Sequence, residues 1–198
     1  MSPCGCWKKR DIDKKGAFRA FVADTTELVG KAAKIHDLFP VATAALGRTL
    51  TAASIMGLDL KDDTEGLSIQ ICGDGPLGNI VTAADCHGNV RGYVDEPHVD
   101  IPLKNNKLDV SGAVGSGFLA IAKSMGTGEP YVGRVDLQTG EIAEDIAYYF
   151  MNSQQTPSVV ALGVLVDVDY TVKAAGGYMI QLLPGADEEI ISKLEANV

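Results

Sequence analysis

The sequence is poor in the residues on which catalysis, metal binding and secretion usually depend. Its 198 residues include 1 tryptophan, 3 histidines and 4 cysteines, and they contain no C-x-x-C pair. Residues 1–15, MSPCGCWKKRDIDKK, lack the apolar segment of a secretory signal. We therefore expect a cytoplasmic protein whose cysteines are reduced thiols.

Long uncharged apolar runs are also lacking. The stretch poorest in charge, residues 38–58, carries Arg48 near its middle and also contains Pro40 and Gly47. An arginine at the centre of a membrane span costs about 2.5–3.5 kcal/mol on insertion scales. The stretch therefore predicts a buried helix, in a protein with no membrane partner.

Positive charge is scarce as well. Lysine and arginine number 17 against 26 aspartates and glutamates, so the formal net charge is −9. Such an acidic surface repels the phosphates of nucleic acids. We expect no nucleic-acid partner.

The residues able to act in catalysis show no catalytic pattern. The histidines form no recognisable nucleophile arrangement with a serine or cysteine, so each is interpreted as a surface or turn residue. Three carboxylates open a predicted helix, where the helix dipole favours them without a metal ion. We assign no catalytic and no cofactor-binding residue. The residues weighed are His36, His87, His98, Glu141, Glu144 and Asp145.

The cysteines form no metal site that the sequence can identify. Cys4 and Cys6 form a C-x-C near the N-terminus, and Cys72 and Cys86 flank a predicted strand. An extended strand of that length spans roughly 20 Å, whereas zinc–sulfur bonds measure about 2.3 Å. Cys72 and Cys86 therefore cannot share one ion, and Cys72 is interpreted as a small core residue. We expect no metal ligand in this chain.

One glycine-rich loop has the spacing of a nucleotide site. Gly73–Gly78, GDGPLG, matches the G-x-G-x-x-G fingerprint and follows a predicted strand. That fingerprint needs a helix after its third glycine, because the helix N-terminus holds the pyrophosphate. Here the loop is followed by Asn79–Thr82, NIVT, which favours a strand. We interpret the loop as a hairpin turn and keep a nucleotide- or small-ligand-binding enzyme as the alternative.

Periodicity predicts strands interrupted by helices. Strands are predicted where apolar residues alternate, and helices where they recur with a period of about 3.6. Asp37 is expected to cap a long helix that has Pro40 in its first turn and ends at Gly57. The predicted strands cover residues 17–24, 67–72, 79–85, 90–95, 117–124, 131–138, 158–170 and 171–184, and the predicted helices cover 25–34, 37–57, 141–152 and a C-terminal stripe of Ile190, Ile191, Leu194 and Val198.

Several motifs together resemble the redox-regulated chaperonin family called heat shock protein 33. They are TTELV, AALGRTLTAA, GDGPLG, GNVRGYV, GEIAEDIAYYFMNSQQTPSVVALGVLV and AAGGYMIQLLPGA, in the family's order. The resemblance extends from about Ala17 to the last residue. It implies an α+β fold, a compact core with two largely antiparallel β-sheets packed with helices.

The resemblance also implies a function that needs no catalytic residue. Members of the family are ATP-independent holdases, which bind unfolding proteins and prevent their aggregation under oxidative or heat stress. The expected partners are therefore unfolded or partly folded client proteins. A homodimer is left open, the client-binding residues are unassigned, and the chain is expected not to be an enzyme.

The family's redox switch depends on a C-terminal zinc module, and the sequence departs from the family there. The module carries a C-x-C and a later C-x-x-C, and no C-x-x-C occurs here. We therefore expect zinc only in proteins with that module and no cofactor in this chain. The expected division is a flexible N-terminal extension at residues 1–16, a chaperone core at 17–185 and the start of a linker helix at 186–198.

Overall fold

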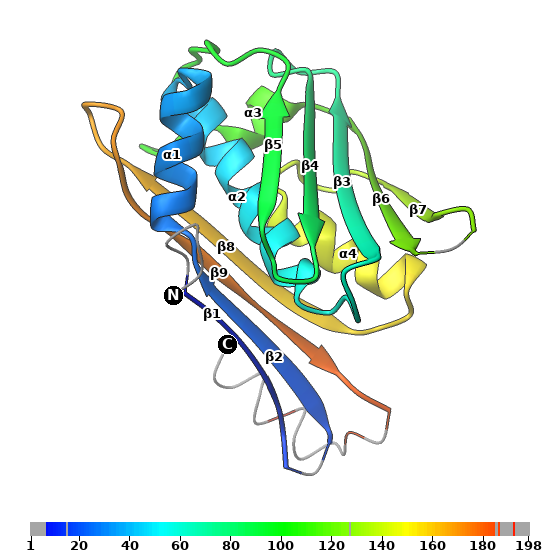
Figure 1. The fold of residues 1–198 in the computed structure, drawn as a ribbon. Helices are drawn as coiled ribbons and strands as arrows, with labels where there is room; N and C mark the ends of the chain where they lie inside the picture. The colour runs from blue at the N-terminus through cyan, green and yellow to red at the C-terminus, as the bar shows by residue number, and fades with distance from the viewer. Residues whose placement is uncertain (1–6, 15, 127, 185, 187–191, 193–198) are drawn as a thin grey trace.

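The chain folds into two antiparallel β-sheets with helices packed between and beside them (Figure 1). The computed structural model describes residues 7–14, 16–126, 128–184, 186 and 192. The predicted α+β fold is confirmed. In chain order the elements are β1 (Trp7–Ile12), β2 (Phe18–Asp24), α1 (Thr26–His36), α2 (Pro40–Gly57), β3 (Glu65–Gly73), β4 (Asn79–Asp85), β5 (Val90–Val94), α3 (Val110–Val114), β6 (Gly117–Met125), β7 (Tyr131–Asp136), α4 (Ala143–Ser153), β8 (Ser158–Val166) and β9 (Val172–Leu182).

The sheets combine distant parts of the chain. The four-stranded sheet has the order β1-β2-β9-β8, and the five-stranded sheet has the order β5-β4-β3-β6-β7. Every pairing between these strands is antiparallel, as in Phe21 opposite Met179 and Ile69 opposite Ile121. The pairing of β2 with β9 joins the N-terminal part of the chain to the last strand that the structure describes.

Helix α2 forms the centre of the molecule. It contacts strands of both sheets and is buried along almost its whole length. Small residues permit this close packing, since a methyl group on Gly47 would lie only 2.7 Å from Val29 Cγ1 and 2.9 Å from Val164 Cγ2. The predicted buried helix is confirmed. Within the described residues, no helix has the length and apolarity needed to cross a membrane.

Polar side chains of α2 find partners inside the core. Thr51 Oγ1 lies 2.7 Å from Thr25 Oγ1, and Ser54 Oγ donates a hydrogen bond of 2.9 Å to the Gly88 carbonyl. Arg48 Nη1 pairs with a carboxylate oxygen of Glu141 at 2.6 Å. The two buried hydroxyl pairings remove the cost of about 1–3 kcal/mol that an unsatisfied buried group carries, whereas Arg48 Nε stays buried without a hydrogen-bond partner among the described residues.

The structure corrects the predicted N-terminal extension for Trp7–Ile12. These residues form β1, which pairs with β2 as an edge strand of the four-stranded sheet. Lys8 Nζ also donates to the Gly88 carbonyl in the β4–β5 turn. Local periodicity missed this strand because WKKRDI shows no alternation of apolar residues. Residues 1–6 lie outside the described residues, and the division of the chain at residue 185 stays a prediction.

One prediction at a helix end was wrong, and one short helix was missed. Asp37 ends α1 in the left-handed conformation, with φ at 52°, and α2 begins at Pro40 after Phe39. Helix α3 was not predicted because it has only 5 residues and includes Gly112, whose N–H donates to the Asp109 carboxylate at 2.9 Å. The predicted C-terminal apolar stripe of Ile190, Ile191, Leu194 and Val198 lies outside the described residues.

Candidate functional site on the four-stranded sheet

The face of the four-stranded sheet that points away from the helices is the candidate site. Side chains alternate between the two faces of a strand, and Phe21, Ala175 and Met179 are buried in the core. The residues that alternate with these three along β2 and β9 therefore point away from α1, α2 and α4, which lie on one side of this sheet (Figure 1). The apolar residues of this outer face are Trp7, Phe18, Ala20, Val22, Val159, Ala161, Leu165, Ala174, Tyr178, Ile180 and Leu182.

This outer face is apolar but is exposed to solvent in several places. Val22, Val159 and Leu165 are 40%, 43% and 58% exposed. Strands that are apolar on both faces are typical of sheets that are covered on both sides. Contiguous exposed apolar patches of more than a few hundred Å² mark interaction sites. The outer face is therefore a surface that can bind a partner.

Cross-strand pairing makes the outer face continuous. Ile180 lies between Ala20 of β2 and Val159 of β8. Gly163 and Gly176 pair further along the same two strands, β8 and β9. Because glycine has no side chain, the sheet has little bulk at that point. The result is an apolar surface that runs across β2, β9 and β8.

Charged side chains lie at the border of the outer face. Lys9 and Asp11 of β1 form an ion pair of 3.1 Å. Asp24 ends β2, and the backbone hydrogen bond from Thr26 holds the pKa of Asp24 below its usual value. An apolar centre with a polar rim is the usual arrangement of a protein-binding surface.

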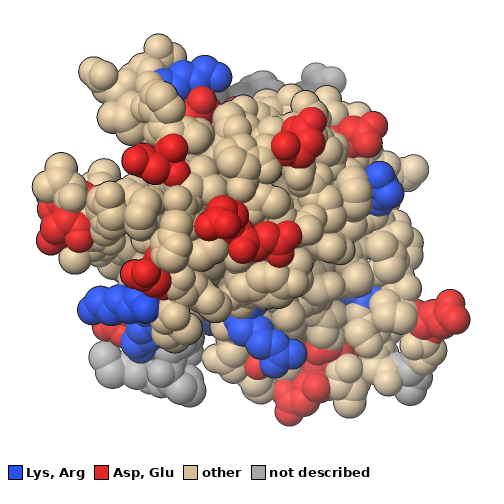
Figure 2. Space-filling model, turned by 90° about the horizontal axis from the view of Figure 1, so that it is seen from above, with Lys and Arg blue, Asp and Glu red and all other residues tan. Residues whose placement is uncertain are grey.

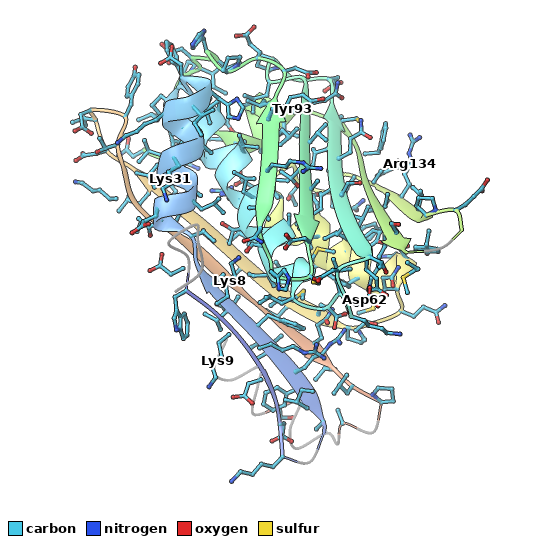
Figure 3. All side chains as sticks on the ribbon, viewed as in Figure 1. Lys8, Lys9, Lys31, Asp62, Tyr93 and Arg134 are labelled. Carbon is cyan, nitrogen blue, oxygen red and sulfur yellow. The ribbon has the colours of Figure 1, made fainter. Side chains whose placement is uncertain are left out.

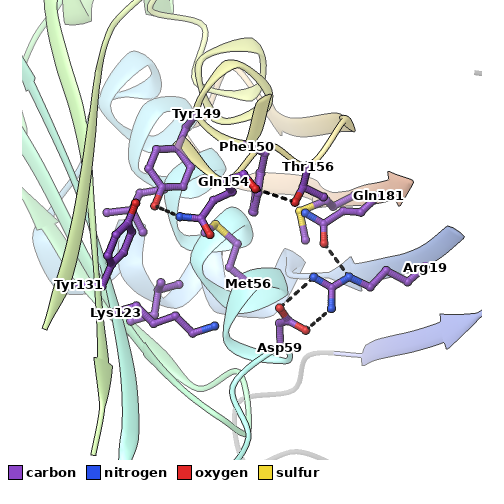
Figure 4. A pocket seen from close by; sticks show the side chains of 13 residues that line it. Arg19, Met56, Asp59, Lys123, Tyr131, Tyr149, Phe150, Gln154, Thr156 and Gln181 are labelled. Carbon is purple, nitrogen blue, oxygen red and sulfur yellow. Dashed lines mark hydrogen bonds and ion pairs between the residues drawn. The ribbon is translucent and has the colours of Figure 1, made fainter. Parts of the chain in front are cut away.

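A cleft on the inner side, between the sheets, lacks catalytic groups (Figure 4). Its cavity volume is about 90 Å³, and it is partly open to solvent. Arg19 donates two hydrogen bonds to Asp59, of 2.6 and 3.0 Å, and a third of 2.8 Å to Gln181. Gln154 donates to the Tyr149 hydroxyl at 3.2 Å. Apart from Lys123 and Tyr131, the labelled polar residues are hydrogen-bonded to one another, and the described lining residues include no nucleophile next to a general base.

The backbone amides of the glycine-rich loop Gly73–Gly78 form hydrogen bonds within the protein. Strand β4 follows Gly78, so the loop leads into no helix N-terminus, and the hairpin interpretation is confirmed. The backbone N–H groups that would have to bind a phosphate are already used. The hydrogen bonds run from Asp74 N to Ser116 O at 2.8 Å, from Gly75 N to Val114 O at 2.9 Å and from Leu77 N to Ala113 O at 3.1 Å.

Alanine at Gly75 or Gly78 is expected to destabilise the protein for two different reasons. A methyl group at Gly75 would lie 2.4 Å from the Ala113 carbonyl oxygen, so Gly75→Ala should cost about 1–3 kcal/mol. Gly78 has φ of +66°, so Gly78→Ala should cost about 1–2 kcal/mol. Urea denaturation measures both. Gly163→Ala is the control because nothing lies within 4 Å of its added methyl group. Unchanged stability at Gly75 would contradict the packing of this loop on α3.

Cys72 and Cys86 lie at opposite ends of the β3–β4 hairpin. Cys72 pairs with Asn79 beside the turn, and Cys86 follows β4, so a four-cysteine zinc group does not fit the described cysteines. Cys72 is half-buried, which corrects its interpretation as a core residue. Burial raises the pKa of Cys72, and the hydrogen bond to Asp63 raises the pKa of Cys86 to about 11. Both are therefore thiols at neutral pH rather than reactive thiolates.

Two of the three histidines lie next to carboxylates. His87 Nε2 lies 2.8 Å from Asp63 Oδ1, and His98 Nε2 lies 3.0 Å from Asp37 Oδ2. His36 lies in the last turn of α1. The structure thus brings two histidines next to acids that sequence reasoning had not connected with them.

The carboxylates at the start of α4 differ in their surroundings. Glu141 pairs with Arg48, and Glu144 is exposed. Asp145 is fully buried and accepts hydrogen bonds from the backbone N–H groups of Gln138, Thr139 and Ile142. The helix dipole therefore explains only in part why Glu141 and Asp145 stand at the start of this helix.

Acidic side chains predominate on the surface drawn in Figure 2. They are spread across this face, and lysine and arginine lie mostly toward its margin. This distribution agrees with the net charge of −9. The absence of a nucleic-acid partner stays a prediction from that charge.

Fold and surface together define an α+β domain that presents an apolar sheet. Comparison with protein families agrees with this description and identifies the family. The family described as "Hsp33 protein" matches residues 9–198. The chain belongs to the Hsp33 family.

Curated relatives of the chain are described as 33 kDa chaperonins. The protein of Ruminiclostridium cellulolyticum is 52% identical over 182 residues, which are 91% of this chain and 62% of the relative. The protein of Alkaliphilus oremlandii is 55% identical over 182 residues, which are 91% of this chain and 61% of the relative. The chain thus spans about three-fifths of the length of these relatives.

A solved structure has the same fold. It is the crystal structure of the 33 kDa chaperonin (heat shock protein 33 homolog) from Thermotoga maritima, which is 37% identical in sequence to this chain. The TM-score is 0.92, and the match covers 96% of this chain and 66% of that one.

Proposed function

We propose that this chain is a holdase, which binds unfolding proteins without ATP and prevents their aggregation. The observation that carries the proposal is the exposed apolar outer face of the four-stranded sheet, including Val22, Val159 and Leu165. Unfolding proteins expose apolar segments, and burial of apolar area contributes roughly 25 cal/mol per Å². Membership of the Hsp33 family supports the proposal.

The outer face has the properties that a binder of many sequences needs. The hydrophobic effect is non-directional, so apolar side chains of any order can pack on Tyr178 or Ile180. Hydrogen-bond donors and acceptors, which would select one sequence, are few in its centre. The acidic rim residues Asp11 and Asp24 leave the centre apolar while they keep the protein charged.

The proposed role is non-enzymatic and belongs to the cytoplasmic response to oxidative and heat stress. Redox regulation is part of the same proposal for the full-length family, in which the zinc module supplies the switch. Cys72 and Cys86 do not supply that switch, because neither is a thiolate at neutral pH. Homodimer formation stays open in this proposal.

Suppression of aggregation by the 198-residue chain is the test. A denatured client protein is diluted into buffer with and without the chain, in the absence of nucleotide, and light scattering is recorded. We expect scattering to fall as the ratio of chain to client rises. An unrelated acidic protein of similar size is the control. Equal scattering with the chain and with this control would refute the holdase.

Titration with NAD and ATP tests the alternative enzyme. The occupied amides of Gly75 and Leu77 lead us to expect no saturable binding at micromolar concentration. Saturable binding of NAD or ATP that is lost in Gly75→Ala would support the alternative, a nucleotide-binding enzyme built on this loop. This outcome is independent of the aggregation measurement.

A further inference from the structure

Three side chains of different chemistry meet at one end of the five-stranded sheet. Asp63 lies in the turn between α2 and β3, and Cys86 and His87 lie in the turn between β4 and β5. The two turns are neighbours because Gly66, at the start of β3, pairs with Asp85, at the end of β4. Figure 3 shows Asp62, the residue before Asp63, toward the same end of the five-stranded sheet as the β4–β5 turn.

The α2–β3 turn is held by its own hydrogen bonds. Asp62 Oδ1 accepts from the backbone N–H of Thr64 at 2.9 Å and from its hydroxyl at 2.6 Å. Lys61 N donates to a carboxylate oxygen of Glu65 at 2.8 Å. The position of Asp63 in this turn is therefore defined by residues on both sides of it.

The β4–β5 turn is held in a similar way. Asp85 Oδ1 accepts from the backbone N–H groups of His87 and Asn89, both at 2.9 Å. The carbonyl of Gly88 accepts from Ser54 of α2 and from Lys8 of β1. The Asp85 carboxylate is thus used within its own turn. The side chains of Cys86 and His87 instead reach Asp63 in the neighbouring α2–β3 turn.

The three side chains converge on one oxygen atom. Cys86 Sγ donates to Asp63 Oδ1 at 3.0 Å, and His87 Nε2 lies 2.8 Å from the same oxygen. All three ligand atoms lie within 4.8 Å of one another. In tetrahedral zinc sites, bonds of about 2.0–2.3 Å separate neighbouring ligand atoms by roughly 3.3–3.6 Å. To accept an ion, the two distances to Asp63 Oδ1 would lengthen by about half an ångström, and Cys86 Sγ and His87 Nε2 would settle at the same spacing from a starting separation of at most 4.8 Å.

We propose that Asp63, Cys86 and His87 form a surface binding site for one zinc ion. A thiolate, an imidazole nitrogen and a carboxylate oxygen are the ligand types that zinc takes in proteins, whereas magnesium and calcium prefer oxygen ligands. Three protein ligands leave the fourth position to water. The site is accessible, because the side chains of Asp63 and His87 are 80% and 67% exposed.

Zinc binding replaces the proton that Cys86 now shares with Asp63. The thiol proton is released to solvent, the sulfur binds zinc as a thiolate, and His87 binds through its unprotonated Nε2. The thiolate and the carboxylate balance the two positive charges of the ion. Bound zinc would link the α2–β3 turn to the β4–β5 turn. This proposal revises the expectation that the chain contributes no metal ligand.

Cobalt substitution is the test, because cobalt bound to a thiolate absorbs strongly in the near ultraviolet. The parent protein is the 198-residue chain with Cys4→Ser and Cys6→Ser, which removes the C-x-C as a competing ligand pair. We expect this absorption to saturate at one equivalent of cobalt and to be lost when zinc is added. Cys86→Ser should abolish it, and Cys72→Ser, at the other end of the hairpin, should leave it unchanged.

Zinc affinity measured against a coloured chelator tests the other two ligands. Loss of a residue that only supports a metal ligand weakens binding by about 10–100-fold, so loss of a ligand itself in Asp63→Asn or His87→Gln should weaken zinc binding at least tenfold. Melting temperatures without metal show whether each variant is folded. Zinc should raise the melting temperature of the parent but not that of His87→Gln.

Three outcomes would overturn the proposal. The first is a parent protein without the thiolate absorption, and the second is absorption that persists in Cys86→Ser. The third is zinc affinity within about twofold of the parent in both Asp63→Asn and His87→Gln, since zinc would then be bound without these two residues.

Discussion

Replacing Val22 and Val159 together by aspartate should reduce aggregation suppression about tenfold. The two residues lie on the outer face and are 40% and 43% exposed. A charge within an apolar contact loses hydration without gaining a partner, and a tenfold loss of affinity corresponds to about 1.4 kcal/mol. The measurement is the concentration of chain that halves light scattering by an aggregating client.

A matched double variant separates the loss of this surface from added charge. Val132→Asp with Met151→Asp adds the same charge at two residues that are 60% and 51% exposed, on β7 and α4. We expect this control to suppress aggregation as well as the unmodified chain. Melting temperatures show that both variants are folded. Equal losses in the two variants would place client binding somewhere other than the outer face.

Much of the fold could be predicted from local sequence signals. Pro40 and Gly57 delimit α2 because proline fits the first turn of a helix and glycine favours its end. The strands of the five-stranded sheet alternate in burial, as in β3 and β4, so their period of two is visible in the sequence. These features depend on neighbours in sequence, and the prediction succeeded for that reason.

Features that depend on distant contacts could not be predicted. Strand β1 reads WKKRDI, without apolar alternation, and its side chains reach distant carbonyls: Lys8 donates to Gly88 O, and Arg10 donates to Leu58 O at 3.4 Å. The zinc-site candidates Asp63 and Cys86 are 23 residues apart, and only the β3–β4 pairing brings them together. No periodicity in one segment contains this information.

The outer face could be recognised only in part. Strands β2 and β9 carry apolar residues on both faces, as with Met179 and Ile180, and this pattern predicts burial on both sides. The sequence does not show on which side the helices lie. Only the structure shows that α1, α2 and α4 lie on one face of this sheet (Figure 1).

Replacing Asp145 by alanine should lower the free energy of unfolding by about 3–5 kcal/mol. Its carboxylate is fully buried and accepts hydrogen bonds from Gln138 N at 2.7 Å, Thr139 N at 3.0 Å and Ile142 N at 3.0 Å. Each buried donor left unpaired costs about 1–3 kcal/mol. Ile142 also has φ of 75°, which is rare for a β-branched residue. Urea denaturation monitored by circular dichroism measures the loss.

Glu144→Ala is the control, because Glu144 is an exposed acid in the same first turn of α4. If only the helix dipole mattered, both substitutions would cost about 0.3–1 kcal/mol. If the carboxylate holds the segment between β7 and α4, Asp145→Ala should cost several times more than Glu144→Ala. Asp145→Asn keeps one acceptor oxygen and should fall between them. A small and equal effect of Asp145→Ala and Glu144→Ala would show that the buried hydrogen bonds contribute little. Because α4 packs on β8, loosening of this segment should also reduce the stability of the four-stranded sheet that carries the outer face.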